Sequence, residues 1–201
     1  MEEEIEKIKS NSYVPTLLLH ACCAPCSSAC IERLADFFKI TILFYNPNIT
    51  DEDEYYKRYR ELERFVDSFD VKYKIDVIDG GYDSECFFEM AKGLEDSLER
   101  GKRCYKCYEL RIGKTKEIAD RGDFDYFTTT LSLSPYKVVS WINEIGSRVA
   151  GSGKSKFLNC DFKKRNGYKR SIELSSLYNL YRQDYCGCIY SKNARYKNNT
   201  D

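Results

Sequence analysis

The sequence lacks any apolar stretch that approaches the ~20 residues of a membrane-spanning helix. It also lacks an excess of charge, since 32 Lys and Arg residues balance 32 Asp and Glu residues. Residues 1–10 are rich in Glu and Lys and have no apolar export signal. We therefore expect a cytoplasmic protein with no membrane partner, in which any polyanion must bind to local clusters of positive charge.

Other signatures are missing as well. No internal repeat or linker interrupts the chain, so we expect one domain over residues 1–201, with a basic segment from about 161 to 201. No dinucleotide fingerprint is present, which argues against a nicotinamide cofactor. Gly151-Ser-Gly-Lys-Ser155 is similar to a phosphate loop, but Arg148 stands where that motif requires its first glycine. We interpret this stretch as an ordinary loop between a helix and a strand.

Apolar runs alternate with helix-like patterns along the chain. The expected strands span residues 16–20, 40–45, 71–78, 126–131 and 157–160, and the expected helices span 26–38, 51–69, 83–121 with a break near 101, 136–149 and 172–182. Strands separated by helices at this spacing predict an α/β fold, a Rossmann-like parallel sheet with helices on both faces. In such sheets functional residues gather at the carboxyl ends of the strands.

The ten cysteines are the most informative residues, because most of them are bunched. Bunching favours a metal or redox site over structural disulfides. The bunched cysteines are Cys22, Cys23, Cys26, Cys104, Cys107, Cys186 and Cys188. The isolated ones, Cys30, Cys86 and Cys160, lie in apolar patterns and are expected in the core.

Cys22, Cys23 and Cys26 lie in a turn from a strand to a helix, where free backbone N–H groups and the helix dipole favour thiolates. The alternative is a set of small buried residues. The one histidine, His20, precedes this turn. His20 is a candidate proton donor or a partner for a bound sulfur, and a packed imidazole is the alternative.

Cys104 and Cys107 lie three residues apart and would face the same side of a helix. Two thiolates from this pair and two from the first turn make the four that a cubane cluster or a tetrahedral zinc requires. The thiolate set alone does not identify the metal. In Cys186-Gly-Cys188, Gly187 permits a tight turn that brings two sulfurs together, which suits a transient electron store or a second metal site. Two incidental thiols are the alternative.

A basic stretch with aromatic residues, Asp161-Phe-Lys-Lys-Arg-Asn-Gly-Tyr-Lys-Arg170, is the one local signal for nucleic acid. Lys and Arg can neutralise phosphates, and tyrosines can stack on unpaired bases. A solvated loop is the alternative.

Taken together, these motifs resemble the cobalamin-independent epoxyqueuosine reductases of the QueH family. The resemblance covers nearly the whole chain. It is carried by His20-Ala-Cys-Cys-Ala-Pro-Cys-Ser27, Arg103-Cys-Tyr-Lys-Cys-Tyr-Glu-Leu-Arg111, Thr129-Thr-Leu-Ser-Leu-Ser-Pro135, Asp161-Phe-Lys-Lys, Arg170-Ser-Ile-Glu-Leu-Ser175 and Tyr181-Arg-Gln-Asp-Tyr-Cys-Gly-Cys188. Several long motifs in one order are more specific than any single pair of cysteines.

The resemblance implies a fold similar to ATP-pyrophosphatase (HUP-type) domains, with the cysteine turn in place of their phosphate loop. It implies a [4Fe–4S] cluster, for which Cys22, Cys23, Cys104 and Cys107 match the family's ligands. Cys26 is an alternative ligand, or a ligand of a second, mononuclear metal such as iron. The Cys186/Cys188 pair matches a redox-active pair.

The implied reaction removes an epoxide oxygen from epoxyqueuosine in the anticodon of tRNA, which takes two electrons and two protons. The resemblance implies an electron donor of unknown identity as a partner. It does not imply binding of DNA. Proton donors would be His20, Asp184 or Tyr185. Anticodon-stem phosphates would bind Lys163, Lys164, Lys169 and Arg170. The rival interpretations are a zinc-stapled RNA-binding module and a tRNA sulfur transferase of related fold, and the latter needs an ATP loop that the sequence lacks.

Overall fold

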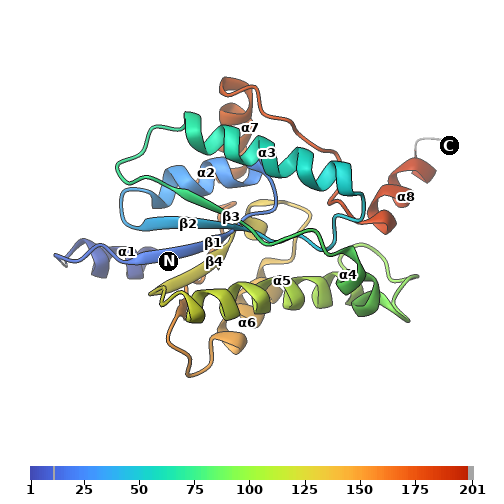
Figure 1. The fold of residues 1–201 in the computed structure, drawn as a ribbon, viewed down its shortest axis with the longest axis horizontal. Helices are drawn as coiled ribbons and strands as arrows, with labels where there is room; N and C mark the ends of the chain where they lie inside the picture. The colour runs from blue at the N-terminus through green and yellow to red at the C-terminus, as the bar shows by residue number, and fades with distance from the viewer. Residues whose placement is uncertain (11, 199–201) are drawn as a thin grey trace.

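Five parallel strands in the order β3-β2-β1-β4-β5 form the centre of the fold (Figure 1). The computed structural model describes residues 1–10 and 12–198. The strands are β1 Thr16–His20, β2 Lys39–Phe44, β3 Asp76–Asp79, β4 Tyr126–Thr129 and β5 Lys156–Phe157. In β1 the side chains of Leu17, Leu18 and Leu19 are all fully buried, because helices cover both faces of the sheet. This confirms the predicted Rossmann-like α/β class.

Most of the helices form two layers, one on each face of the sheet, while α1 and α8 lie at the two ends of the molecule (Figure 1). The helices are α1 Glu2–Lys9, α2 Ala24–Leu34, α3 Glu52–Ser68, α4 Ser84–Ala91, α5 Lys102–Arg121, α6 Val139–Ala150, α7 Gly167–Leu177 and α8 Ile189–Asn198, with a 3-10 turn η1 at Thr130–Leu133. Side chains of α2, α3 and α7 share one apolar core with Leu17 and Leu19. Side chains of α5 and α6 share a second core with Leu18. Alternate residues of β1 thus anchor opposite layers.

Several predicted element boundaries differ from the structure. The third strand begins at Asp76 and not at residue 71, because only Asp76–Asp79 pairs with β2. The fourth strand ends at Thr129, whose side chain accepts a hydrogen bond from the Leu131 N–H and starts the 3-10 turn. The break predicted near Gly101 is present, since α4 ends at Ala91 and α5 begins at Lys102. The last predicted helix, 172–182, lies instead at Gly167–Leu177.

Two helices were not predicted. The first, α1, buries Ile5 and Ile8 against the sheet although most of its residues are charged. The second, α8, lies within the predicted basic segment, of which residues 199–201 fall outside the described part of the chain. The Gly151–Ser155 stretch joins α6 to β5, as the loop interpretation predicted.

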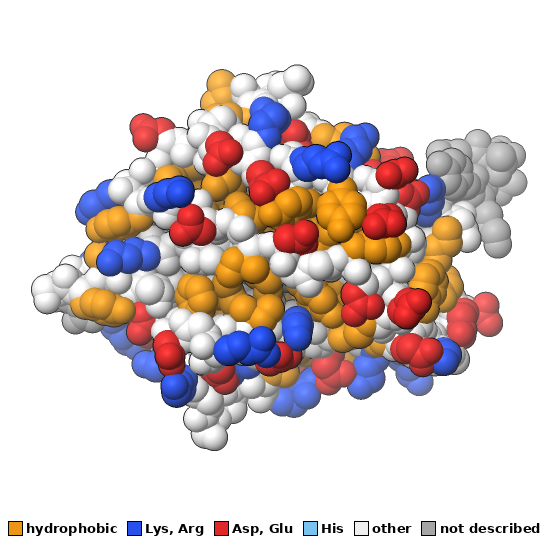
Figure 2. Space-filling model, in the orientation of Figure 1, with side chains coloured by type: hydrophobic (Ala, Val, Ile, Leu, Met, Phe, Trp, Pro, Cys, Tyr) orange, Lys and Arg blue, Asp and Glu red, His pale blue; other side chains and the backbone are white. Residues whose placement is uncertain are grey.

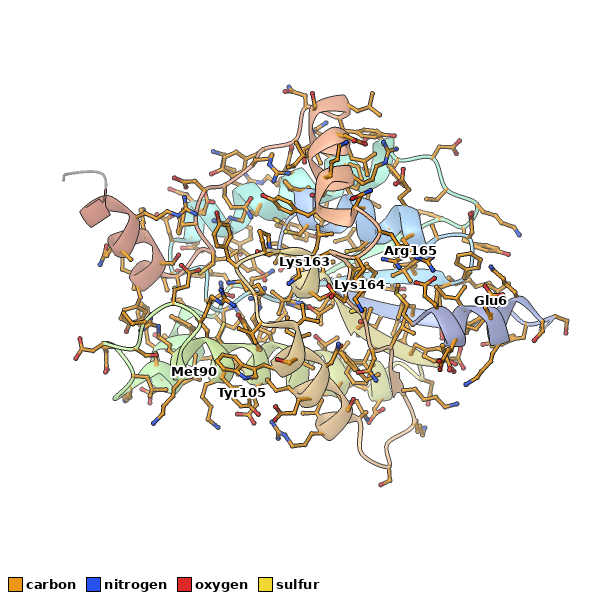
Figure 3. All side chains as sticks on the ribbon, turned by 180° about the vertical axis from the view of Figure 1, so that it is seen from behind. Glu6, Met90, Tyr105, Lys163, Lys164 and Arg165 are labelled. Atoms are coloured by element: carbon orange, nitrogen blue, oxygen red, sulfur yellow. The ribbon has the colours of Figure 1, made fainter. Side chains whose placement is uncertain are left out.

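Charges of both signs are interspersed over the helices on the face shown in Figure 2. The basic residues Lys163, Lys164 and Arg165 lie on the opposite side of the molecule (Figure 3). Among the described helices, none combines the length and the apolarity needed to cross a bilayer.

Candidate redox site at the carboxyl edge of the sheet

The turn that follows β1 gathers three sulfur atoms. The Sγ atoms of Cys22, Cys23 and Cys26 all lie within 4.8 Å of one another. Cys23 caps α2 in an extended conformation and Pro25 lies in the first turn, so the chain passes directly from strand to helix. The Ser27 hydroxyl donates to the Cys23 carbonyl at 2.8 Å, which fixes the turn. The predicted thiol-bearing strand-to-helix turn is therefore confirmed.

The three thiols have unequal acidity. Hydrogen bonds from Cys23 and Cys26, with the positive charge of Arg111, hold the pKa of the Cys22 thiol well below its usual value. The same contact to Cys22, together with burial, raises the pKa of Cys23 to about 12. Cys22 is therefore the thiol that ionises first, and its thiolate, hydrogen-bonded by Cys23 and Cys26, is a suitable ligand for a metal cation.

Cys104 and Cys107 lie in the first two turns of α5, as predicted. Neither belongs to the group of sulfurs within 4.8 Å of one another in the described residues. Arg111 follows Cys107 by one turn on the same face of the helix. Its positive charge acts on the thiols of both Cys22 and Cys107. Arg111 therefore lies near both cysteine groups, and its guanidinium donates to Asn46 Oδ1.

The C-terminal pair is close together, with 3.5 Å between the Sγ atoms of Cys186 and Cys188. Gly187 between them has a φ of +106°, which a residue with a side chain rarely adopts. Asn48 donates to the Cys186 carbonyl at 3.0 Å and holds the segment in place. Cys188 packs with Cys107 in one apolar cluster, against which Cys186 also packs. All ten cysteines are free thiols.

Lys137 supplies a second positive charge at these sulfurs. Burial by itself would lower the pKa of its ammonium group, but the nearby Cys186 and Tyr108 raise it. The sulfurs of Cys104 and Cys107 act in the same direction. Among the described residues, Lys137 has no carboxylate partner within 4.0 Å. The ammonium group of Lys137 therefore lies near Cys186 and near the Cys104/Cys107 pair.

A cavity connects the Cys22–Cys26 turn and Cys186 to the surface, whereas Cys104 and Cys107 do not line it. The cavity has about 840 Å³ of empty space, part of which is open solvent, and its lining includes Cys22, Cys23, Cys26, Cys186, Arg111 and Lys137. Asp184 and Tyr185 also line it. Burial raises the pKa of the Tyr185 hydroxyl to about 12. A substrate that enters this cavity meets sulfur atoms, five basic side chains that include Arg111 and Lys137, and the exposed carboxylates of Glu99 and Asp184.

His20 does not line the cavity. Its ring is fully buried, with Nδ1 at 2.8 Å from Thr129 Oγ1 and Nε2 at 3.0 Å from the Tyr45 carbonyl. Burial, followed by the charge of Arg111, lowers the pKa of His20 to about 3. This geometry favours the alternative of a packed, neutral imidazole that ties β1 to β2 and β4.

The predicted RNA-binding residues fall into two groups. Lys163, Lys164 and Lys169 have no carboxylate within 4.0 Å in the described part of the chain, and the first two are labelled in Figure 3. Arg170 is paired with Glu32 of α2 at 2.7 Å and with Glu173 at 3.1 Å. Its charge is therefore largely neutralised within the protein.

Sequence reasoning missed Lys137, Arg111 and Gln183. The spacing of Arg111 from Cys104 and Cys107, seven and four residues, places all three on one helix face and could have identified it. Gln183 lines the cavity with an Oε1 atom that has no hydrogen-bond partner among the described residues. No periodic pattern marks Lys137 or Gln183.

The chain is similar to proteins of one family. The family model described as "Epoxyqueuosine reductase QueH" matches residues 17–194. Relatives that carry this name come from Streptococcus pyogenes serotype M1, with 38% identity over 95% of this chain and 76% of that protein, and from Staphylococcus epidermidis, with 42% identity over 88% and 76%. A third, from Haemophilus influenzae, is 41% identical over 92% of this chain and 75% of that protein.

Proposed function

The chain belongs to the epoxyqueuosine reductase QueH family and is an oxidoreductase of queuosine biosynthesis, and from this premise we propose how its residues perform the reduction. The substrate is epoxyqueuosine at the wobble position of tRNA, and a [4Fe–4S] cluster held by this chain's cysteines would supply electrons. The observation that carries the proposal is the group of three sulfur atoms within 4.8 Å at the end of β1.

The donor set suits an iron–sulfur cluster. Cys22, Cys23, Cys104 and Cys107 provide the four thiolates, and the charge of Arg111, felt by both pairs, balances part of their negative charge. Cys26 lies within reach as a fifth sulfur, either as an alternative ligand or for a second, mononuclear iron. A bound cluster would supply electrons at low potential, one at a time.

The reaction breaks two C–O bonds of the epoxide and leaves an alkene and water, and it consumes two electrons and two protons. Because a bound cluster would pass one electron at a time, it would deliver the first electron, and Cys186 and Cys188, alone or through a metal, would supply the second equivalent. Their 3.5 Å separation suits a transient store that a donor protein refills between turnovers.

Residues of the cavity handle charge and protons. Asp184 is exposed at the cavity and carries protons from solvent toward the epoxide oxygen. The ammonium group of Lys137 stabilises the negative charge that develops on this oxygen as a C–O bond breaks. Tyr185 is a second donor beside Asp184.

The tRNA binds along the basic segment. Lys163, Lys164 and Lys169 contact anticodon-stem phosphates, because their ammonium groups have no carboxylate partner within 4.0 Å in the described residues. Arg170 contributes less, since Glu32 and Glu173 already neutralise it.

Nucleoside mass spectrometry of reacted tRNA tests the function. Anaerobically purified protein with a chemical reductant should convert epoxyqueuosine to queuosine over many turnovers. The double variant Cys186→Ser/Cys188→Ser should lose multiple turnover yet keep the visible absorption of the cluster. Cys86→Ser is the matched control, a half-buried thiol outside these groups. A colourless, zinc-containing protein without turnover would favour the rival RNA-binding module.

A further inference from the structure

The mouth of the cavity carries an exposed aromatic ring. Tyr136 lines the cavity, and its side chain is 55% exposed. Many other large aromatic side chains among the described residues are buried. A surface tyrosine at the entrance of a site offers an open π face to whatever enters.

A tight turn holds this ring outward. The Ser134 hydroxyl accepts from the Tyr136 N–H at 3.3 Å, and the Ser134 carbonyl accepts from the Lys137 N–H at 3.2 Å. Pro135 restricts the turn further. The side chains of the two successive residues therefore point in different directions. Lys137 points inward to the sulfur atoms of Cys186, Cys104 and Cys107, whereas Tyr136 stays at the surface.

The helix α8 supports the ring from the side. The Arg195 guanidinium lies 5.9 Å from the centroid of the Tyr136 ring. Ser191, one turn earlier on α8, is buried against the cavity, and its N–H donates to Cys188 Sγ at 3.3 Å. The contact of Arg195 with Tyr136 is therefore anchored to the C-terminal cysteine pair.

The same turn touches the basic segment. The Lys163 ammonium group donates to the Lys137 carbonyl at 3.4 Å. Lys163, one of the lysines proposed to bind phosphate, and the exposed ring of Tyr136 thus lie on adjoining segments beside the cavity. Aromatic rings next to a basic track are how proteins hold unpaired nucleotides without reading their sequence.

We infer that Tyr136, supported by Arg195, is a stacking site for an unpaired base that flanks the modified nucleoside in the RNA loop. The inference rests on the proposed function. A nucleoside that enters the cavity must leave the base stack, so a neighbouring base loses its own stacking partner. Tyr136 replaces that partner at the mouth.

A binding cycle with an anticodon stem-loop RNA tests this inference. Epoxyqueuosine occupies the wobble position, and the base on its 5′ or its 3′ side is replaced by an abasic site. For the natural chain, one of the two abasic RNAs should bind about tenfold more weakly, as expected for one lost stacking contact. Tyr136→Ala should weaken binding of the intact RNA by about the same factor and should be insensitive to the abasic site. Fluorescence anisotropy measures the six affinities of the two proteins for the three RNAs.

The controls separate stacking from folding and charge. Tyr136→Phe should bind like the natural chain, because a ring without the hydroxyl still stacks. Tyr13→Ala removes another exposed tyrosine, 60% exposed at the opposite edge of the sheet, and should leave RNA affinity unchanged. Arg195→Lys keeps the charge but loses the planar group, and it should weaken binding less than Tyr136→Ala.

Equal binding of all three RNAs to the natural chain would overturn the inference, as would effects of Tyr136→Ala and the abasic site that simply add. Failure of the proposed function has a different signature. In that case the natural chain leaves the epoxide of the intact RNA unreduced, whatever the outcome of the binding cycle.

Discussion

Replacing Gly187 by alanine should damage both the fold and the C-terminal thiol pair. The residue has a φ of +106°, and a Cβ atom there would lie 2.7 Å from Ile49 Cγ1 and 3.3 Å from a nitrogen of Arg58. The chain at Gly187 must then shift, and Cys186 and Cys188 on either side shift with it.

The magnitude has two parts. A side chain in this backbone region costs on the order of 1–3 kcal/mol. Forcing a methyl group into a filled site costs roughly 1–3 kcal/mol more. A loss of about 2–6 kcal/mol in the free energy of unfolding is a large share of the ~5–15 kcal/mol that stabilises a typical domain.

Gly113→Ala is the matched control, because the same change should have the opposite sign. Gly113 lies inside α5, and a Cβ atom there would meet nothing within 4 Å. Alanine in a helix interior is favoured over glycine by roughly 0.5–1 kcal/mol. At roughly 2–4 °C per kcal/mol for a chain of this size, thermal unfolding should separate the two variants clearly.

Turnover provides the second readout. Gly187→Ala should lose multiple turnover in proportion to the displacement of the thiols, and Gly113→Ala should retain it. A Gly187→Ala protein with an unchanged unfolding midpoint and full turnover would show that the close packing at this turn is irrelevant.

Three further predictions concern Asp125, Lys164 and Lys137. Asp125 accepts hydrogen bonds from Tyr13 and Thr16. Burial opposes the ionisation of its carboxyl group, but these hydrogen bonds outweigh burial and hold the pKa of Asp125 below its ordinary value. Asp125→Asn should therefore cost about 1 kcal/mol at neutral pH, and the gap from the natural chain in urea unfolding should close as the pH falls through this lowered pKa; a gap that persists at low pH contradicts the assignment. Lys164→Ala should reduce the slope of log affinity for RNA against log salt by roughly 0.9, whereas Arg170→Ala should change it little; equal slopes for both variants would exclude the distinction between free and paired cations. Lys137→Gln should lower kcat by about a hundredfold with a smaller change in KM, and an unaltered kcat would remove Lys137 from the chemistry.

The sequence predicted the elements whose signals are local. Leu17 to Leu19 form a short apolar run that predicts a buried strand, and the cysteines after it lie at the carboxyl edge, where parallel sheets place their sites. The helix face that carries Cys104 and Cys107 follows from their spacing alone.

Features that depend on distant residues were not predictable. The sequence predicts Arg170 as a free cation. In the structure Glu32, 138 positions away in the chain, neutralises its charge. The sequence predicts His20 as a possible proton donor. Its burial depends on Thr129 in β4 and on the Tyr45 carbonyl just after β2, which contact its ring. The inward path of Lys137 depends on the four-residue turn Ser134–Lys137, which has no periodic signature.

The central claim is that two distant cysteine groups hold one cluster, and metal analysis of single variants tests it most directly. Iron, acid-labile sulfide and electron paramagnetic resonance would be measured on anaerobically purified Cys22→Ser, Cys104→Ser and Cys86→Ser proteins. One shared cluster predicts about four irons per chain for Cys86→Ser and loss of nearly all iron and signal in each of the other two. If Cys22→Ser and Cys104→Ser each kept a metal bound to the untouched group, the cysteines would form two separate sites and the account would be wrong.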